Sequence, residues 1–97
     1  MQVVELTQHE ADAVKIFQAL GDPTRFRIVH MLLEREELGC AEIQGIFRLS
    51  APGLSYHFRI LQDCGLLVVR KEGQFHYFRL QRERLERLLL ILSSKLV

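Results

Sequence analysis

Apolar positions recur with helical spacing over most of this 97-residue chain. Ala11, Val14 and Phe17 repeat at intervals of three, and Gly21 follows as a helix stop. Asp22 and Pro23 are typical of an N-cap and a first helical position, so a second helix begins there. The same period predicts five helices, over residues 8–20, 23–33, 39–47, 50–63 and 82–97.

The helix predicted over 50–63 has the clearest signals. Ser50 is a good N-cap, and Pro52 falls in the first turn, where no backbone donor is needed. Leu54, Phe58 and Leu61 form one apolar stripe, and Gly65 stands where a left-handed C-terminal cap is expected. The segment therefore predicts an amphipathic helix with one free polar face.

After Gly65 the period changes from helix to strand. Residues 66–70 are apolar and β-branched, 71–74 have turn composition, and 75–80 are rich in aromatic residues, which predicts a hairpin. The fold class is therefore mainly α with a β-hairpin wing (α+β): a winged helix-turn-helix of five helices, with a two-stranded wing between the fourth and fifth. Residues 1–97 form a single domain, with the helix-turn-helix at 39–63 and the wing at 66–80.

The apolar positions also predict how the individual helices are buried. The helix over 23–33 has Phe26 and Leu33 on one face and Ile28 and Leu32 on another, which predicts burial on both sides. The short helix over 39–47 should turn Ile46 inward. The excess on the last helix, with the first, predicts a subunit interface between residues 1–20 and 82–97. Its members are Val14, Phe17, Leu85, Leu88, Leu89, Leu92 and Leu96.

The composition indicates where in the cell the protein acts and which class of partner it binds. No apolar run approaches the roughly 18 residues of a membrane-spanning helix, and no secretory leader begins the chain, so we expect a cytoplasmic protein without membrane contact. Residues 1–47 carry four Lys/Arg against eight Asp/Glu, whereas residues 48–97 carry nine against four. The basic half contains the helix over 50–63 and the wing, and this placement of positive charge favours a nucleic-acid partner.

The ordered motifs resemble a known family. Residues 19–25 read ALGDPTR, Leu49-Ser50 precede the fourth helix, residues 57–61 read HFRIL, and 70–74 read RKEGQ before the second wing strand. This order is similar to that of the ArsR/SmtB-type winged-helix repressors, over roughly residues 12 to 92. The resemblance implies a homodimeric transcriptional repressor on an inverted-repeat operator in double-stranded DNA. An effector would release it.

The expected DNA contacts come from the fourth helix and the wing. Ala51, Pro52 and Gly53 offer no side-chain donor to a base edge, so Ser55 and Tyr56 should carry direct readout. His57 is a further candidate, although a packed histidine is the favoured alternative. The full set of candidate DNA-binding residues is Ser50, Ala51, Pro52, Gly53, Ser55, Tyr56, His57, Arg59, Arg70, Lys71 and Gln74.

Metal ligands and reactive thiols are the two kinds of candidate sensor in this sequence. The last helix has no Asp, His or Cys. Where metalloid-sensing relatives have Cys-x-Cys, this chain has Gly39, Cys40 and Ala41, so both ligand positions are lost and Cys40 occupies the spacer. We therefore expect no metal and no cofactor. Cys40 and Cys64 are candidate thiol sensors, because the start of a helix favours a thiolate at Cys40 and Cys64 ends the recognition helix.

Other classes of function have less support. No phosphate-binding loop, metal-hydrolase motif or nucleophile elbow is present, so an enzyme is not expected. The poor reading face at residues 51–53 leaves one alternative open, a winged-helix protein-interaction module without tight DNA binding.

Overall fold

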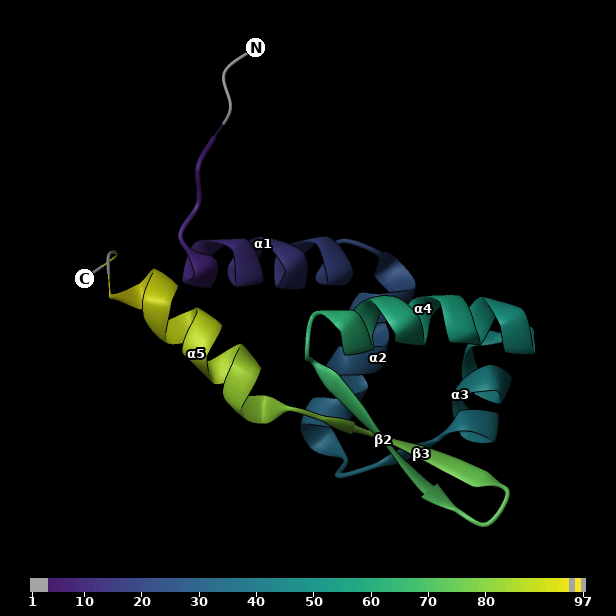
Figure 1. The fold of residues 1–97 in the computed structure, drawn as a ribbon. Helices are drawn as coiled ribbons and strands as arrows, with labels where there is room; N and C mark the ends of the chain where they lie inside the picture. Colours follow the sequence, from purple (N-terminus) through teal and green to yellow (C-terminus); the bar gives the residue numbers. More distant parts are fainter. Residues whose placement is uncertain (1–3, 95, 97) are drawn as a thin grey trace.

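The computed structural model describes residues 4–94 and 96, and Figure 1 shows its arrangement. The elements follow in the order α1 (Gln8–Leu20), α2 (Pro23–Glu34), β1 (Leu38–Gly39), α3 (Cys40–Phe47), α4 (Ala51–Asp63), β2 (Leu67–Glu72), β3 (Phe75–Leu80) and α5 (Arg82–Ser93). The predicted class, five helices with a wing between the fourth and fifth, is confirmed. The last helix ends at Ser93 rather than at residue 97, and residues 1–3, 95 and 97 lie outside the described part.

The helix ends form where the sequence places their signals. The Asp22 carboxylate accepts from the Arg25 N–H at 3.1 Å, and Ser50 Oγ accepts from the Gly53 N–H at 3.1 Å. Each bond satisfies a backbone donor that the first turn of a helix leaves unpaired. Gly65 follows α4 with φ +81°, the left-handed conformation that glycine adopts without steric cost.

The sheet differs from the predicted hairpin in two ways. It has three antiparallel strands in the order β1-β3-β2, because Leu38 and Gly39 pair with Phe78 and Tyr77. A strand of two residues is too short to show alternation, so no pattern in the sequence indicated it. The turn is also shorter than predicted: Lys71 and Glu72 belong to β2, and the chain reverses at Gly73, whose φ is +59°.

The core lies between α1, α2 and α4, and α2 and α4 also pack against the sheet. The predicted α4 stripe is confirmed, since Leu54, Phe58 and Leu61 are all buried. Phe58 stacks on Phe78 of β3, and this contact joins α4 to the wing. Leu38, although in the missed strand, is fully buried.

Three apolar expectations are wrong in the single chain. Phe26 and Leu33 of α2 are 55% and 40% exposed, because α2 packs through Ile28, Val29 and Leu32. Ile46 is also exposed. Leu88, expected at a subunit interface, is instead buried within its own chain against the core.

Candidate nucleic-acid interface

The free face of α4 carries the predicted reading residues. Ser55, Tyr56 and Arg59 are exposed, and Tyr56 retains 59% of its accessible surface. Ala51 and Pro52 are exposed beside them. Gly53 is half-buried, and a Cβ there would lie 3.2 Å from Ser50 Oγ, so glycine leaves room for the cap that begins the helix.

His57 points away from this face, toward the start of α2. Its Nδ1 lies 3.1 Å from Arg25 Nη1 and 3.8 Å from the Asp22 carboxylate, and its side chain is only 14% exposed. Because an arginine only donates, Nδ1 is the acceptor in the hydrogen bond from Arg25. Arg25 also donates to the Ala19 carbonyl at 2.7 Å. We therefore correct the assignment of His57 as a base reader: it connects α4 to the α1–α2 turn.

The wing presents different side chains on its two faces. Lys71 pairs with His76, and Val69 with the buried Phe78, so these four residues share the face that is turned toward α4. Lys71 and His76 are exposed near the tip of that face, and Gln74 is exposed in the turn. His76 was missed by the sequence analysis, although strand alternation with Lys71 would have found it.

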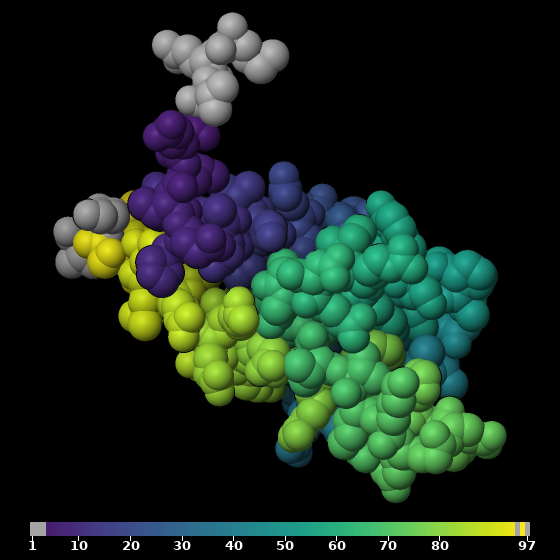
Figure 2. Space-filling model, viewed as in Figure 1, coloured from purple at the N-terminus to yellow at the C-terminus, as the bar shows by residue number. Residues whose placement is uncertain are grey.

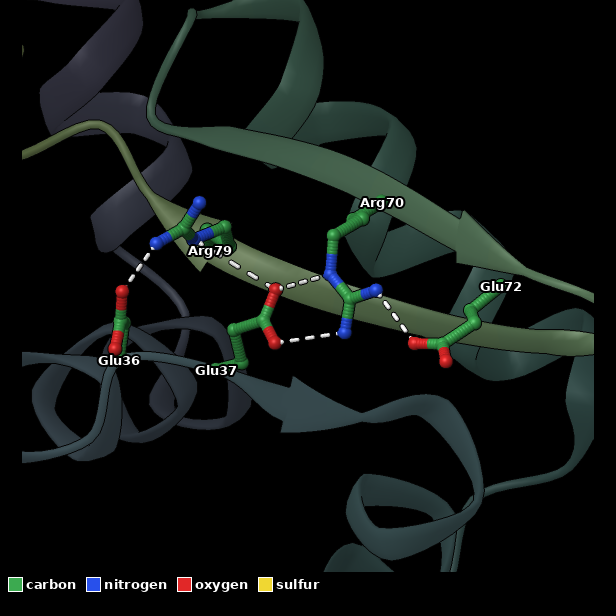
Figure 3. A network of polar contacts seen from close by, with 5 residues as sticks. All are labelled: Glu36, Glu37, Arg70, Glu72 and Arg79. Carbon is green, nitrogen blue, oxygen red and sulfur yellow. Dashed lines mark hydrogen bonds and ion pairs between the residues drawn. The ribbon is translucent and has the colours of Figure 1, made fainter.

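Arg70 lies on the opposite face of the wing, in the ion-pair network of Figure 3. Its Nε and Nη2 donate to the two carboxylate oxygens of Glu37 at 2.7 and 2.9 Å, and its Nη1 donates to Glu72 at 2.7 Å. Its guanidinium also lies 4.5 Å from the centre of the Tyr77 ring. All three guanidinium nitrogens of Arg70 are bound to carboxylates. The sequence analysis predicted that Arg70 contacts DNA, but in this structure its guanidinium is engaged within the protein.

The candidate dimer surface is formed by α1 and α5, which adjoin at the end of the molecule away from the wing tip (Figure 2). Val14 and Phe17 of α1, Leu89 and Leu92 of α5, and Leu96 beyond the end of α5 are all at least 40% exposed. Leu85, by contrast, is only partly exposed and packs with Leu88 against the core. The exposed residues, without Leu85 and Leu88, are the part of the predicted set that a second chain can cover.

The two thiols lie in surroundings that favour the protonated form. Burial raises the pKa of Cys40, which lines an open groove of about 810 Å³ between α3 and β3. Burial also raises the pKa of Cys64, whose Sγ donates to the Leu61 carbonyl at 3.3 Å. Burial therefore acts against the thiolate that the start of α3 was predicted to favour at Cys40.

The described part of the chain contains neither a cluster of metal ligands nor a membrane-spanning helix. Within residues 4–94 and 96, no three His, Cys, Asp or Glu side chains gather as a metal ion would require. Over the same residues, every helix is too short or too polar to cross a membrane.

Comparison with known proteins identifies the family. A helix-turn-helix domain model matches residues 20–70. A CadC homolog of Staphylococcus aureus, named as a cadmium resistance transcriptional regulatory protein, is 35% identical over 81 residues, which cover 84% of this chain and 67% of that protein.

Solved structures agree with that match. HlyU of Vibrio cholerae superposes with a TM-score of 0.74 and 31% identity, over 89% of this chain and 94% of that one. A crystal structure described as an ArsR family transcriptional regulator gives a TM-score of 0.79 and 26% identity, over 93% and 92%. The chain belongs to the ArsR family of winged helix-turn-helix transcriptional regulators.

Proposed function

We propose that the protein is a homodimeric, sequence-specific repressor that binds an inverted-repeat operator in double-stranded DNA. The observation that carries this proposal is the division of α4 into two faces. Leu54, Phe58 and Leu61 anchor the helix in the core, whereas Tyr56 is 59% exposed on the other side. A large aromatic residue left exposed on a rigidly held helix is suited to contact base edges in a major groove.

The remaining contacts follow from position. Ser55 lies beside Tyr56 on the exposed side of α4 and would share base readout, while Arg59 would reach phosphate. Lys71 and His76 on the α4 side of the wing, with Gln74 at its tip, would contact the flanking backbone or minor groove. This set differs from the sequence prediction by the loss of His57 and Arg70 and the gain of His76.

The dimer would form through the exposed apolar residues of α1 and α5. Phe17 of α1 and Leu89 of α5 are 48% and 58% exposed, and a second chain would cover apolar side chains of this kind. Two-fold symmetry would place the two α4 helices roughly 34 Å apart, one duplex turn, and this spacing requires an operator with two-fold symmetry.

An effector would release the repressor from its operator. The raised pKa values of Cys40 and Cys64 leave little thiolate at neutral pH, which weighs against thiol oxidation as the signal. We therefore propose that the effector does not act by oxidising Cys40 or Cys64.

The decisive experiment is a duplex-binding titration at several salt concentrations. We expect tight, salt-sensitive binding to DNA from upstream of the protein's own gene and weaker binding to random duplex. Tyr56→Ala should lower the ratio of the two affinities by about tenfold, the discrimination of one good base contact. Gln62→Ala is the matched control, because Gln62 is exposed at the far end of the same helix. An unchanged ratio in Tyr56→Ala would refute the role of this face.

A further inference from the structure

The link between α2 and β1 is bound to the wing by a cluster of charges. Glu37, in this link, accepts two hydrogen bonds from Arg70 of β2 and lies 3.7 Å from Arg79 Nε of β3. Its neighbour Glu36 also pairs with Arg79. As Figure 3 shows, the Glu37 carboxylate lies between the two arginines, so a single side chain contacts both strands of the wing.

Glu37 and Glu36 differ in how firmly they are held. The Glu37 side chain is 24% exposed and its carboxylate is bidentate to Arg70, whereas the Glu36 side chain is 81% exposed and pairs with Arg79 alone. An exposed single ion pair contributes little, but a bidentate arginine pair fixes geometry as well as charge. The hydrogen bonds from Arg70 lower the pKa of Glu37, which stays ionised at neutral pH.

The outer half of the wing has little other support. Leu67 and Phe78 are buried near its base, but Lys71, Glu72, Gly73, Gln74, Phe75 and His76 are all exposed. A hairpin without a packed face is marginally stable in water. Arg70, the residue directly before Lys71, lies on the face of the wing opposite α4. Its contacts with Glu37, Glu72 and Tyr77 cover that face.

We infer that Glu37 is a positioning residue for DNA binding, which acts through Arg70 to hold the wing so that Lys71 and His76 on the other face meet the DNA backbone. The inference rests on the proposed function. Arg70 thus supports the wing rather than binding phosphate, and the α2–β1 link sets the angle of the wing relative to α4.

The test compares Glu37→Gln with Glu36→Gln in operator binding. Both variants remove one negative charge from the same link, so any general electrostatic gain is equal. We expect Glu37→Gln to bind operator about tenfold more weakly than Glu36→Gln, the loss of roughly one charge-assisted phosphate contact. The dependence of log K on log salt should also become shallower by about 0.9 for each lost phosphate contact, a change that general destabilisation would not produce.

Two further variants identify the route of the effect. Arg70→Lys keeps the charge but cannot form the bidentate pair, so it should weaken binding as Glu37→Gln does; a true phosphate ligand would tolerate this change better. Lys71→Ala should cost less affinity in the Glu37→Gln background than in the native protein, because Lys71 no longer meets the backbone there. Should Glu37→Gln fail to fold, Arg70→Lys carries the same comparison.

The outcomes separate this inference from the proposed function. If the native protein binds no duplex in a salt-dependent way, the proposed function fails and the inference with it. If the native protein binds operator but Glu37→Gln matches Glu36→Gln in affinity and salt dependence, the inference alone is overturned.

Discussion

Phe58 of α4 stacks face to face on Phe78 of β3, with ring centroids 3.4 Å apart and planes inclined by 21°. Both rings are almost fully buried, at 5% and 4% exposure. The helix that carries Tyr56 and the strand that carries His76 are thus joined through one aromatic contact in the core. The Phe58–Phe78 contact therefore fixes the position of the recognition helix relative to the wing.

Replacing Phe78 with alanine tests this joint. We expect the free energy of unfolding to fall by about 3–5 kcal/mol, because a buried ring is lost and a cavity remains. Phe75→Ala is the matched control, since Phe75 lies on the same strand but is 59% exposed. Urea denaturation followed by circular dichroism measures both, and similar losses in the two variants would contradict the packing described.

Two glycines should respond to alanine in opposite ways. Gly65→Ala should destabilise the protein by roughly 1–2 kcal/mol from the left-handed backbone alone, and the new Cβ would also lie 2.9 Å from Arg84 Cζ. Gly45→Ala, in the exposed middle of α3 with no atom within 4 Å, should stabilise it by about 0.5–1 kcal/mol. Thermal unfolding of the two variants gives the signs directly, and a stabilised Gly65→Ala would disprove this account of the α4 cap.

The proposed dimer surface can be distinguished from the core within α5. Leu89→Glu should convert the proposed dimer to a folded monomer, because it places a charge on an exposed apolar position of α5. Leu88→Ala should instead lower stability by about 2–5 kcal/mol and leave the assembly dimeric. Light scattering after size-exclusion chromatography measures the molar mass of each variant in solution and so distinguishes monomer from dimer. Val68→Glu, on an exposed apolar residue of β2 outside this face, is the control and should remain dimeric.

The thiols should react slowly at neutral pH. Since burial raises the pKa of both cysteines, little nucleophilic thiolate is present. In a titration with a chromogenic disulfide, Cys64 should react more slowly than Cys40, because it is the more buried of the two. Both should react faster in denaturant. Rapid reaction of Cys40 in the folded protein would restore thiol sensing as a candidate signal.

Stability should decline in acid. Hydrogen bonds lower the pKa of four carboxylates in the folded state, those of Glu10, Asp22, Glu37 and Glu42. A carboxylate with a depressed folded pKa stabilises the fold fully above its unfolded pKa, and this contribution is lost as pH falls through the folded value. The loss should therefore begin as pH drops below the ordinary range of a carboxyl group. Glu37→Gln should show a smaller decline than the native protein in urea denaturation at acidic and neutral pH.

The sequence by itself determined the order and type of the helices and the face of α4 that is free. Ser50, Pro52 and Gly65 act through the backbone of their own neighbours, and the Leu54–Phe58–Leu61 stripe depends only on the helical period. Such local signals need no tertiary contact to be read. The same reasoning placed Tyr56 and Arg59 on the exposed side of the helix.

Only the tertiary structure decided which side chains remain available. Arg70 and His57 have partners 33 and 32 residues away in the sequence, Glu37 and Arg25, and no local pattern identifies such pairs. Leu88 and Leu89 are adjacent leucines, yet one is buried in the core and the other is 58% exposed. The composition of α5 predicts an excess of apolar surface, but the packing of α5 against α1 and the core determines which leucines a second chain can cover.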